Sequence, residues 1–205
     1  MDKAKKEFIT FLIDAGALRF GQFRLKSGIE SPFFINLGDI TSGRALQQVG
    51  RALARVIHNT FPQTTILFGP PYKGISLVTA AAMALHTEYS HHTHILYNRK
   101  EAKTHGEGGN FVGYKPSEND RILVIDDVLT TGGTKLEAIQ NVESAFAAPV
   151  DGILVTVDRR TKGMGSGGLD RYNLKAIVTL PDVIEYLEHI DSPHAAEMKT
   201  FYEDV

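Results

Sequence analysis

The sequence predicts an α/β fold in which helices cover both faces of a mostly parallel sheet. From about residue 65 onward, apolar runs of four to six residues alternate with helical patterns. Near-continuous apolar runs are typical of strands that are buried on both faces. The chain has 205 residues, of which 42% are hydrophobic and 22% charged, as in ordinary globular proteins. This length fits one domain, which would bury about 70% of its unfolded surface.

The first forty residues predict a smaller unit that precedes this alternation. Phe8 and Leu12 lie at helical spacing, and Gly16 is a plausible end for their helix. Two short extended segments are expected next, at residues 20–26 and 31–37, with a turn between them.

After the first forty residues, the sequence predicts five strands and five helices, of which the first helix precedes the alternating part. The strands are expected at residues 65–68, 94–97, 121–125, 152–157 and 175–179. The helices are expected at residues 44–59, 76–86, 134–146, 182–189 and 195–202. In such sheets, ligands bind beyond the carboxyl ends of the strands. The chemistry should therefore lie in the loops that follow Phe68, Tyr97, Ile125 and Val157.

The composition excludes several classes of protein. Because the chain has no cysteine, it has no disulfide, no thiolate zinc site and no cysteine nucleophile, and a cytoplasmic location is expected. The longest apolar run has six residues, whereas a spanning helix needs about 20. The first residues are polar and lack the apolar core of a secretion signal. The net charge of −2 gives no reason to expect a nucleic-acid binder.

The strongest chemical signal is an acid pair, Asp126 and Asp127, at the end of an apolar strand. A loop of hydroxyls and glycines then leads into a helix, and it consists of Thr130, Thr131, Gly132, Gly133 and Thr134. Backbone N–H groups in such a loop and at a helix N-terminus bind anions. The carboxylates would repel a phosphate, but they suit sugar hydroxyls or a metal. A phosphorylated ribose satisfies both halves of the motif.

Other interpretations of this segment are weaker. It could be a solvated strand end followed by a capping threonine. A Walker A loop would need Gly-Lys-Ser/Thr, and no dinucleotide glycine fingerprint follows any strand. The segment closely resembles the motif with which type I phosphoribosyltransferases bind phosphoribosyl diphosphate (PRPP). The resemblance implies that residues 126–134, including Val128 and Leu129, bind the ribose phosphate.

A second candidate loop lies at residues 69–75, between a strand and a helix, and contains Tyr72 and Lys73. Two prolines and two glycines fix a tight turn, and Lys73 could hold a second anion. By itself this could equally be a rigid turn with an exposed lysine. Any strained or cis peptide in this loop would be the bond before Tyr72, where it would be costly because Tyr72 is not a proline. In the family, this position binds diphosphate or ribose oxygens.

A third signal is a cationic segment at residues 98–109, with Arg99, Lys100, Lys103 and His105. Its single alanine cannot form a core, so we expect a mobile loop at 99–109 that closes over a polyanion. Such a loop would neutralise charge on a diphosphate leaving group. The alternative is a solvated hairpin tip.

This third segment resembles the catalytic loop of the orotate phosphoribosyltransferase family, and the resemblance extends over essentially the whole chain. It implies a type I phosphoribosyltransferase fold in a single domain, with residues 1–40 forming a hood over the base site. Lys26 would reach PRPP, and Phe34 and the backbone around Ile35 would cover orotate. Thr130 would lie near orotate, and Arg159 would pair with its carboxylate.

The activity that this resemblance implies is transfer of phosphoribose from PRPP to orotate, giving orotidine 5′-monophosphate and diphosphate in UMP synthesis. Lys100, Lys103, His105, Asp126 and Asp127 would carry the catalysis. Mg²⁺ would be the cofactor, carried by the diphosphate rather than by the protein. A homodimer is implied, with the 99–109 loop reaching the neighbouring site.

Two rival functions follow from the same motifs. A transferase for a purine or for uracil would share the PRPP site but would have no need of Arg159. A PRPP-sensing regulator that binds nucleic acid should carry a basic face. Two further segments have simpler interpretations: the glycine-rich residues 163–168 as a connector, and the histidine cluster at 91–94 as an exposed turn.

Overall fold

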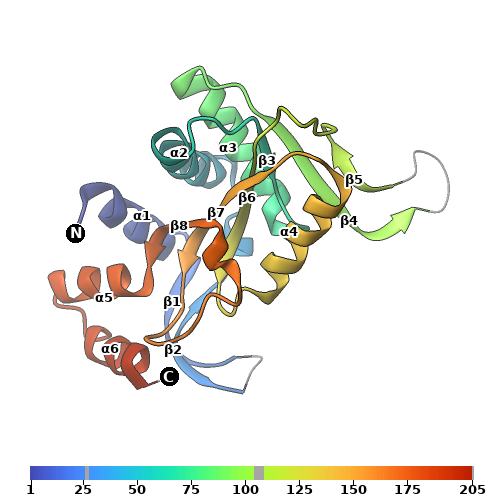
Figure 1. Ribbon diagram of the computed structural model, residues 1–205. Coiled ribbons are helices and arrows are strands. Elements are labelled where there is room, and N and C mark those ends of the chain that lie inside the picture. Colours follow the sequence, from blue (N-terminus) through green and yellow to red (C-terminus); the bar gives the residue numbers. More distant parts are fainter. Residues whose placement is uncertain (26–27, 104–108, 205) are drawn as a thin grey trace.

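The computed structural model describes residues 1–25, 28–103 and 109–204. Its centre is a sheet of six strands in the order β5-β4-β3-β6-β7-β8 (Figure 1). All neighbouring pairs are parallel except β4 and β5, so the mostly parallel sheet is confirmed. The strands are β3 (Ile66–Phe68), β4 (His94–Lys103), β5 (Gly109–Gly113), β6 (Ile122–Leu129), β7 (Val150–Asp158) and β8 (Asn173–Thr179).

Six α-helices accompany the sheet in the described part of the chain. They are α1 (Lys3–Asp14), α2 (Gly43–Thr60), α3 (Lys73–Tyr89), α4 (Gly133–Ala145), α5 (Leu180–His189) and α6 (Ala195–Asp204). Helix α2 begins after Ser42, whose side chain accepts a hydrogen bond from the Ala45 N–H at 3.2 Å, a standard N-cap. None of the helices described is both long and apolar enough to cross a membrane.

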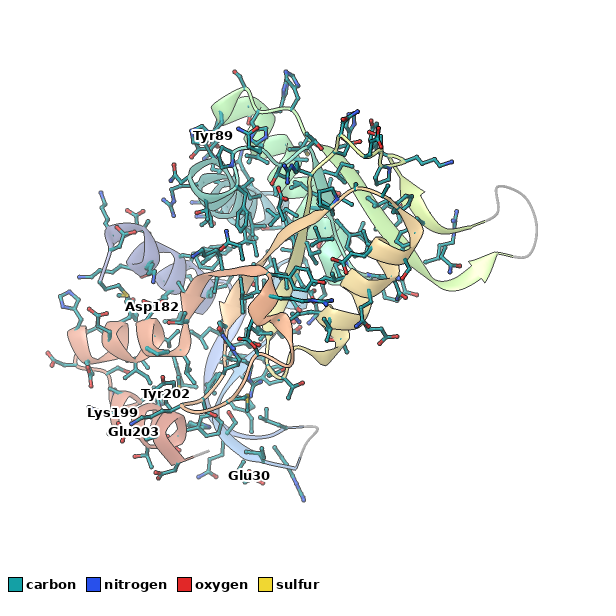
Figure 2. The ribbon with its side chains drawn as sticks, viewed as in Figure 1. Glu30, Tyr89, Asp182, Lys199, Tyr202 and Glu203 are labelled. Atoms are coloured by element: carbon teal, nitrogen blue, oxygen red, sulfur yellow. The ribbon has the colours of Figure 1, made fainter. Side chains whose placement is uncertain are left out.

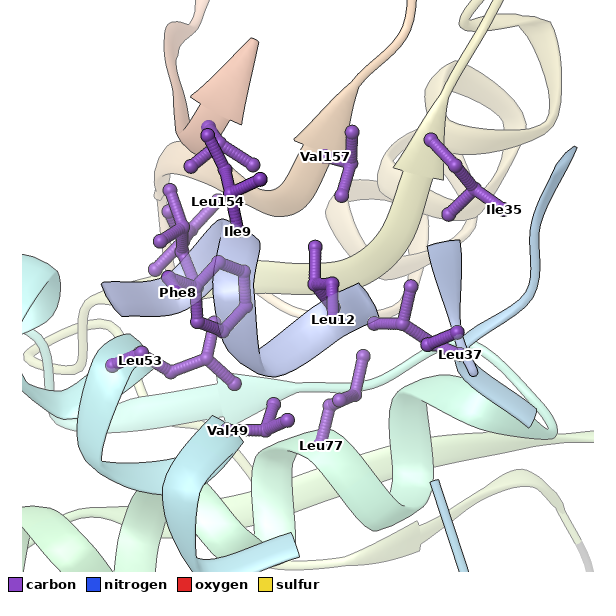
Figure 3. Packing of buried hydrophobic residues seen from close by; sticks show 14 of the residues in the cluster. Phe8, Ile9, Leu12, Ile35, Leu37, Val49, Leu53, Leu77, Leu154 and Val157 are labelled. Carbon is purple, nitrogen blue, oxygen red and sulfur yellow. The ribbon is translucent and has the colours of Figure 1, made fainter. Parts of the chain in front are cut away.

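Alternation along the strands divides the core between the two faces of the sheet. Leu67 and Leu123 belong to a large cluster with α1, α2, α3 and α5, while Ile66 and Val124 belong to a second cluster with α4. Figure 3 shows Phe8 of α1 beside Leu53 of α2 in the first cluster. Both faces are therefore covered, as the apolar strands predict.

The N-terminal segment forms a separate two-stranded antiparallel sheet of β1 (Leu18–Arg24) and β2 (Glu30–Ile35), followed by a short 3₁₀ helix, η1 (Leu37–Asp39). Helix α6 packs against β2, where the rings of Phe33 and Phe201 meet edge-on at 5.5 Å. Figure 2 shows Tyr202 of α6 near the same end of the molecule as Glu30 of β2. Both ends of the chain thus build this small unit.

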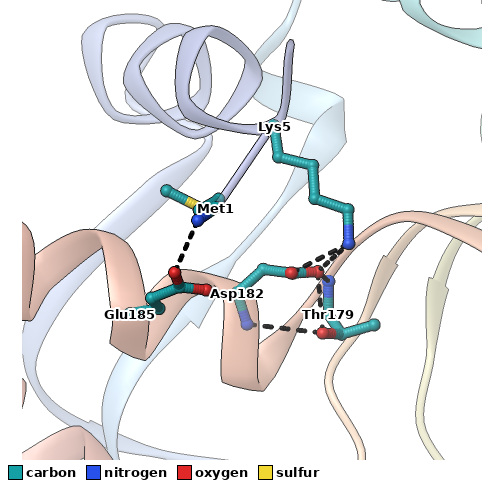
Figure 4. A network of polar contacts seen from close by, with 5 residues as sticks. All are labelled: Met1, Lys5, Thr179, Asp182 and Glu185. Atoms are coloured by element: carbon teal, nitrogen blue, oxygen red, sulfur yellow. Dashed lines mark hydrogen bonds and ion pairs between the residues drawn. The ribbon is translucent and has the colours of Figure 1, made fainter. Parts of the chain in front are cut away.

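A polar network fastens α1 to α5 (Figure 4). Lys5 donates to both carboxylate oxygens of Asp182, at 2.8 and 2.9 Å. Asp182 also accepts from the backbone N–H of Thr179, which completes a capping box at the start of α5. These contacts hold the pKa of Asp182 below its ordinary value despite burial, which acts in the opposite direction. The Met1 ammonium pairs with Glu185 at 2.6 Å.

Several boundaries differ from the sequence-based expectation. Helix α3, expected at 76–86, runs from Lys73 to Tyr89, and two strand ends bear directly on the site. Strand β6 continues through the acid pair to Leu129, because β7 supplies partners as far as Asp158. Strand β4 continues to Lys103, because β5, which the sequence did not predict, pairs with it from Gly109 to Gly113. The expected loop at 99–109 therefore begins inside a strand.

Candidate active site

The chain places an open cleft where the order of strands reverses. Strand β3 is followed along the chain by β4 on one side, while β6 lies on its other side. In open α/β sheets, ligands bind at this kind of switch point, beyond the carboxyl ends of the strands. The cleft has a volume of about 1160 Å³ and is lined by the loops after β3 and β6 and by the β4–β5 hairpin.

The acid pair lies in this cleft, and each carboxylate faces a lysine from the first turn of a helix. Lys73, the first residue of α3, donates to Asp127 Oδ2 at 2.7 Å. Lys135, the third residue of α4, lies 3.0 Å from Asp126 Oδ2. The first contact joins the loops after β3 and β6 across the switch point.

The two ion pairs differ in exposure. The side chains of Lys135 and Asp126 are 7% and 16% exposed, whereas Lys73 is 45% exposed. Burial raises the pKa of Asp126, the charge of Asp127 acts in the same direction, and Lys135 opposes both. Lys135 therefore favours the ionised form of a carboxylate that burial would protonate.

The loop at residues 130–134, here called the phosphate loop, leads from β6 into α4 as the sequence predicts. Thr130 and Thr134 line the cleft. Gly132 lies just before the first residue of α4 with φ +81°, a conformation that favours glycine. Val128 also lines the cleft, but the Leu129 side chain is fully buried in the core beneath α4. Because the strand continues through Leu129 and its side chain is in the core, only the Leu129 backbone is left for a ligand.

The loop after β3 brings Tyr72 and Lys73 to the cleft. The bond between Pro71 and Tyr72 is cis, at the position that the sequence predicts. Tyr72 is 68% exposed. The backbones of Gly69 and Gly74 approach so closely that a Cβ at Gly69 would stand 2.4 Å from the Gly74 carbonyl oxygen. This contact closes the turn.

The structure distinguishes the two adjacent arginines at the end of β7. Arg160 makes a paired contact with Asp158, with nitrogen–oxygen distances of 2.6 to 3.1 Å. Arg159 lies 5.2 Å above the Phe33 ring, and among the residues described its buried Nε has no hydrogen-bond partner. Burial lowers the pKa of Arg159 below its ordinary value. The cation left for a ligand is therefore Arg159.

The aromatic side chains of the hood alternate along β2. Phe33 faces Arg159, whereas Phe34 stacks on Phe23 at 5.6 Å and lies 5.3 Å from the Arg19 guanidinium. Ile35 is buried in the large core, which leaves only its backbone for a ligand. The structure thus does not bring Phe34 and Arg159 together.

The cationic segment is described only in part. Arg99 lines the cleft, and Lys100 and Lys103 belong to β4. His105 and Lys26 lie outside the described residues.

Sequence reasoning missed several residues of the cleft, and Lys135 is the most important of them. A lysine is disfavoured in the first turn of a helix, where the helix dipole is positive, so its place there was a usable signal. Asn98, Asn110 and Phe111 also line the cleft. They belong to the β4–β5 hairpin, whose second strand the sequence did not predict.

Comparisons with known proteins agree with this geometry. Residues 36–171 match the phosphoribosyl transferase domain family. The orotate phosphoribosyltransferase of Chromohalobacter salexigens is 42% identical over 196 residues, covering 90% of this chain and 82% of that protein. That of Ruthia magnifica is 38% identical over 211 residues, covering 100% of this chain and 98% of the relative.

Solved structures give the same result. The crystal structure of orotate phosphoribosyltransferase from Francisella tularensis superposes with a TM-score of 0.81 at 27% identity, covering 98% of this chain and 96% of that one. Together with the sequence relatives, this likeness shows that the chain belongs to the orotate phosphoribosyltransferase family.

Proposed function

We propose that this chain transfers the 5-phosphoribosyl group of PRPP to orotate, with release of diphosphate and formation of orotidine 5′-monophosphate. The observation that carries the proposal is the cleft itself. An acid pair and a loop suited to an anion line it. Just after the neighbouring strand β7 lies Arg159, whose buried Nε has no hydrogen-bond partner among the described residues.

The phosphate loop suits the 5′-phosphate of PRPP. Its backbone and the N-terminus of α4 offer N–H groups, and Thr130, Thr131 and Thr134 add hydroxyl donors. Asp126 and Asp127 would then accept hydrogen bonds from the ribose hydroxyls. Their negative charge would also stabilise the positive charge that develops on the ribose as its bond to diphosphate breaks.

Arg159 suits the carboxylate of orotate. A guanidinium offers a planar pair of donors that matches a carboxylate, and a buried, incompletely paired donor costs free energy until a ligand satisfies it. Orotate would lie beside Arg159 under the hood formed by residues 1–40, with the Ile35 backbone and Thr130 near it. The Phe34 side chain, which the family resemblance places over the orotate ring, packs against Phe23 and Arg19 instead. Because orotate is itself an anion, its ring nitrogen can attack without a strong protein base.

The leaving diphosphate needs cations. Lys73 and Arg99 line the cleft, and the family resemblance adds Lys26, Lys100, Lys103 and His105. A loop closing at residues 99–109 would bring these charges to the leaving group and exclude water.

Mg²⁺ would enter this cleft as a complex with the substrate. Among the residues described, no group of three histidine, aspartate or glutamate side chains could hold a metal, and both cleft aspartates already face lysines. Mg²⁺ takes oxygen ligands in octahedral geometry and commonly keeps phosphate oxygens and water among them. When bound to diphosphate and ribose hydroxyls, it would neutralise charge on the leaving group.

A homodimer would complete the site. A largely apolar groove of about 840 Å³ lies between α2 and α3, and it is lined by Met83, which is 66% exposed, and by Tyr72. Tyr72 also lines the cleft, so a second copy seated in the groove would stand next to the catalytic residues. This position suits a 99–109 loop that serves the neighbouring site.

The test is the loss of orotate absorbance with purified protein, PRPP and Mg²⁺, run in parallel with uracil and hypoxanthine. We expect turnover of orotate alone, dependent on PRPP and abolished by a chelator. Turnover of another base would keep the PRPP site and refute the role of Arg159. PRPP binding without any turnover would favour a regulator.

A further inference from the structure

The glycine-rich residues 163–168 pack against the phosphate loop. Gly167 has φ +64°, and a Cβ there would stand 2.0 Å from the Thr131 carbonyl oxygen. In return, a Cβ at Gly132 would stand 2.3 Å from the Ser166 carbonyl oxygen. The two backbones therefore touch at two points that only glycine allows. The expectation of a mere connector is wrong for residues 166–168.

This contact fixes the direction of one peptide in the phosphate loop. The peptide between Thr131 and Gly132 is trans, so its C=O and N–H point in opposite directions. Since the Thr131 carbonyl is directed at Gly167, the Gly132 N–H is directed away from it. Backbone N–H groups are the donors with which such loops bind phosphate. The position of Gly167 thus determines the direction in which the Gly132 N–H points.

Residues 166–168 are themselves held firmly. The Ser166 side chain is buried and hydrogen-bonded to Asp170, and Leu169 is fully buried in the core beneath α4. A Cβ at Gly168 would stand 3.1 Å from the Leu136 side chain. In contrast, a Cβ at Gly163 or Gly165 would meet no atom within 4 Å. The glycines of the first half of the segment therefore have free space around them, whereas those of the second half are packed against the phosphate loop and α4.

We propose that Ser166, Gly167 and Gly168 form a brace that positions the phosphate loop, with Gly167 as a positioning residue for the ribose 5-phosphate of PRPP. This inference rests on the proposed assignment of the phosphate loop to that phosphate. Its close backbone contacts are to Thr131 and Gly132, and Gly168 faces Leu136, so its effect should fall on PRPP rather than on orotate.

The test compares Gly167→Ala with Gly163→Ala and Gly165→Ala. Gly163 has φ +87°, so its alanine variant carries similar backbone strain without the contact, and Gly165→Ala lacks both. Calorimetric titration with ribose 5-phosphate and steady-state kinetics are measured for each. We expect Gly167→Ala to raise Kd for ribose 5-phosphate and KM for PRPP by about 10- to 100-fold, since a displacement of roughly 1 Å can cost about 100-fold. KM for orotate should stay at the wild-type value in all three variants.

Three outcomes would overturn the brace. In one, Gly167→Ala binds ribose 5-phosphate as Gly163→Ala does. In another, it weakens the binding of orotate and of PRPP equally, which would indicate general damage.

If Gly167→Ala does not fold, Ser166→Ala replaces it, because it removes only the hydrogen bond to Asp170. A raised KM for PRPP alone then supports the brace, and an unchanged KM refutes it. Wild-type protein that fails to bind ribose 5-phosphate would instead refute the proposed site.

Discussion

At the scale of single residues, the cations near the carboxyl ends of the strands differ in their partners. Arg160 is satisfied within the chain by Asp158, whereas its neighbour Arg159 keeps a buried Nε without a partner among the described residues. Lys135 is nearly buried against Asp126, whereas Lys73 is half exposed against Asp127. Charge alone does not distinguish these residues, but burial and pairing do.

Arg159→Lys should weaken orotate binding with little change in PRPP binding. Lysine keeps the charge but loses the planar pair of donors. A hydrogen bond to a charged group contributes about 1.5–3 kcal/mol, so KM for orotate should rise about 10- to 100-fold. Arg160→Lys is the matched control, because Arg160 already pairs with Asp158. A larger effect at Arg160 would reverse the two assignments.

Lys135→Met should shift the pH dependence of the reaction. Methionine keeps the aliphatic stem but removes the charge that holds down the pKa of Asp126. That pKa, already raised by burial, would rise further, so the acid limb of kcat/KM for PRPP should move to higher pH. Lys135→Arg should keep the wild-type profile. A profile for Lys135→Met that falls in height without moving would show that Asp126 need not be ionised.

The same Lys135→Met variant should also lose stability. Removing one partner of a buried ion pair typically costs about 3–5 kcal/mol, because the remaining charge is left unpaired. The pH profile must therefore be recorded where the variant is folded, as shown by circular dichroism.

At the scale of elements, the backbones of α2 and α3 approach closely where the two helices meet at Gly50 and Ala80. A Cβ at Gly50 would stand 2.5 Å from the Ala80 carbonyl oxygen, so the two backbones leave no room for a methyl group. This contact holds α3, and therefore Lys73 at its first residue, in place. A glycine in the interior of α2 thus contributes to the geometry of a distant cleft.

Gly50→Ala should destabilise the protein although alanine is the better helix former. The gain in helix propensity is about 1 kcal/mol, whereas overpacking typically costs about 1–3 kcal/mol or more when the neighbour is backbone. Gly43→Ala, in the same helix but with no atom within 4 Å of its Cβ, should be neutral or slightly stabilising. Urea unfolding at one protein concentration measures both. Equal midpoints would show that the helices separate without cost.

At the scale of the whole molecule, we expect a second copy of the chain to bind in the groove between α2 and α3 and so form the proposed homodimer. Met83→Glu would place a charge on the exposed apolar wall of this groove. We expect sedimentation velocity to show a shift from dimer to monomer, together with a loss of turnover if the loop at 99–109 serves the partner's site. Ile190→Glu, at an exposed position outside the groove, is the control. A dimer that survives Met83→Glu would move the interface elsewhere.

The sequence by itself predicted the strands and helices of the alternating part in their order, apart from β5, and it predicted a ribose-phosphate motif at residues 126–134. These features are local: apolar runs mark buried strands, and an acid pair, a hydroxyl–glycine loop and a helix follow one another within residues 122–134. The cis bond of the 69–75 loop lies before Tyr72, which is where the sequence placed any cis peptide of that loop.

Tertiary structure alone decided which residues face one another. Strand β6 runs on through Leu129 because β7 lies beside it, and β5 exists because β4 offers it an edge. Lys135 meets Asp126, Arg159 meets Phe33, and Gly167 meets Thr131 across sequence separations that no local pattern reports. Such contacts form because the parallel sheet brings the loops at the carboxyl ends of its strands together, and packing of the whole core determines how the strands are arranged.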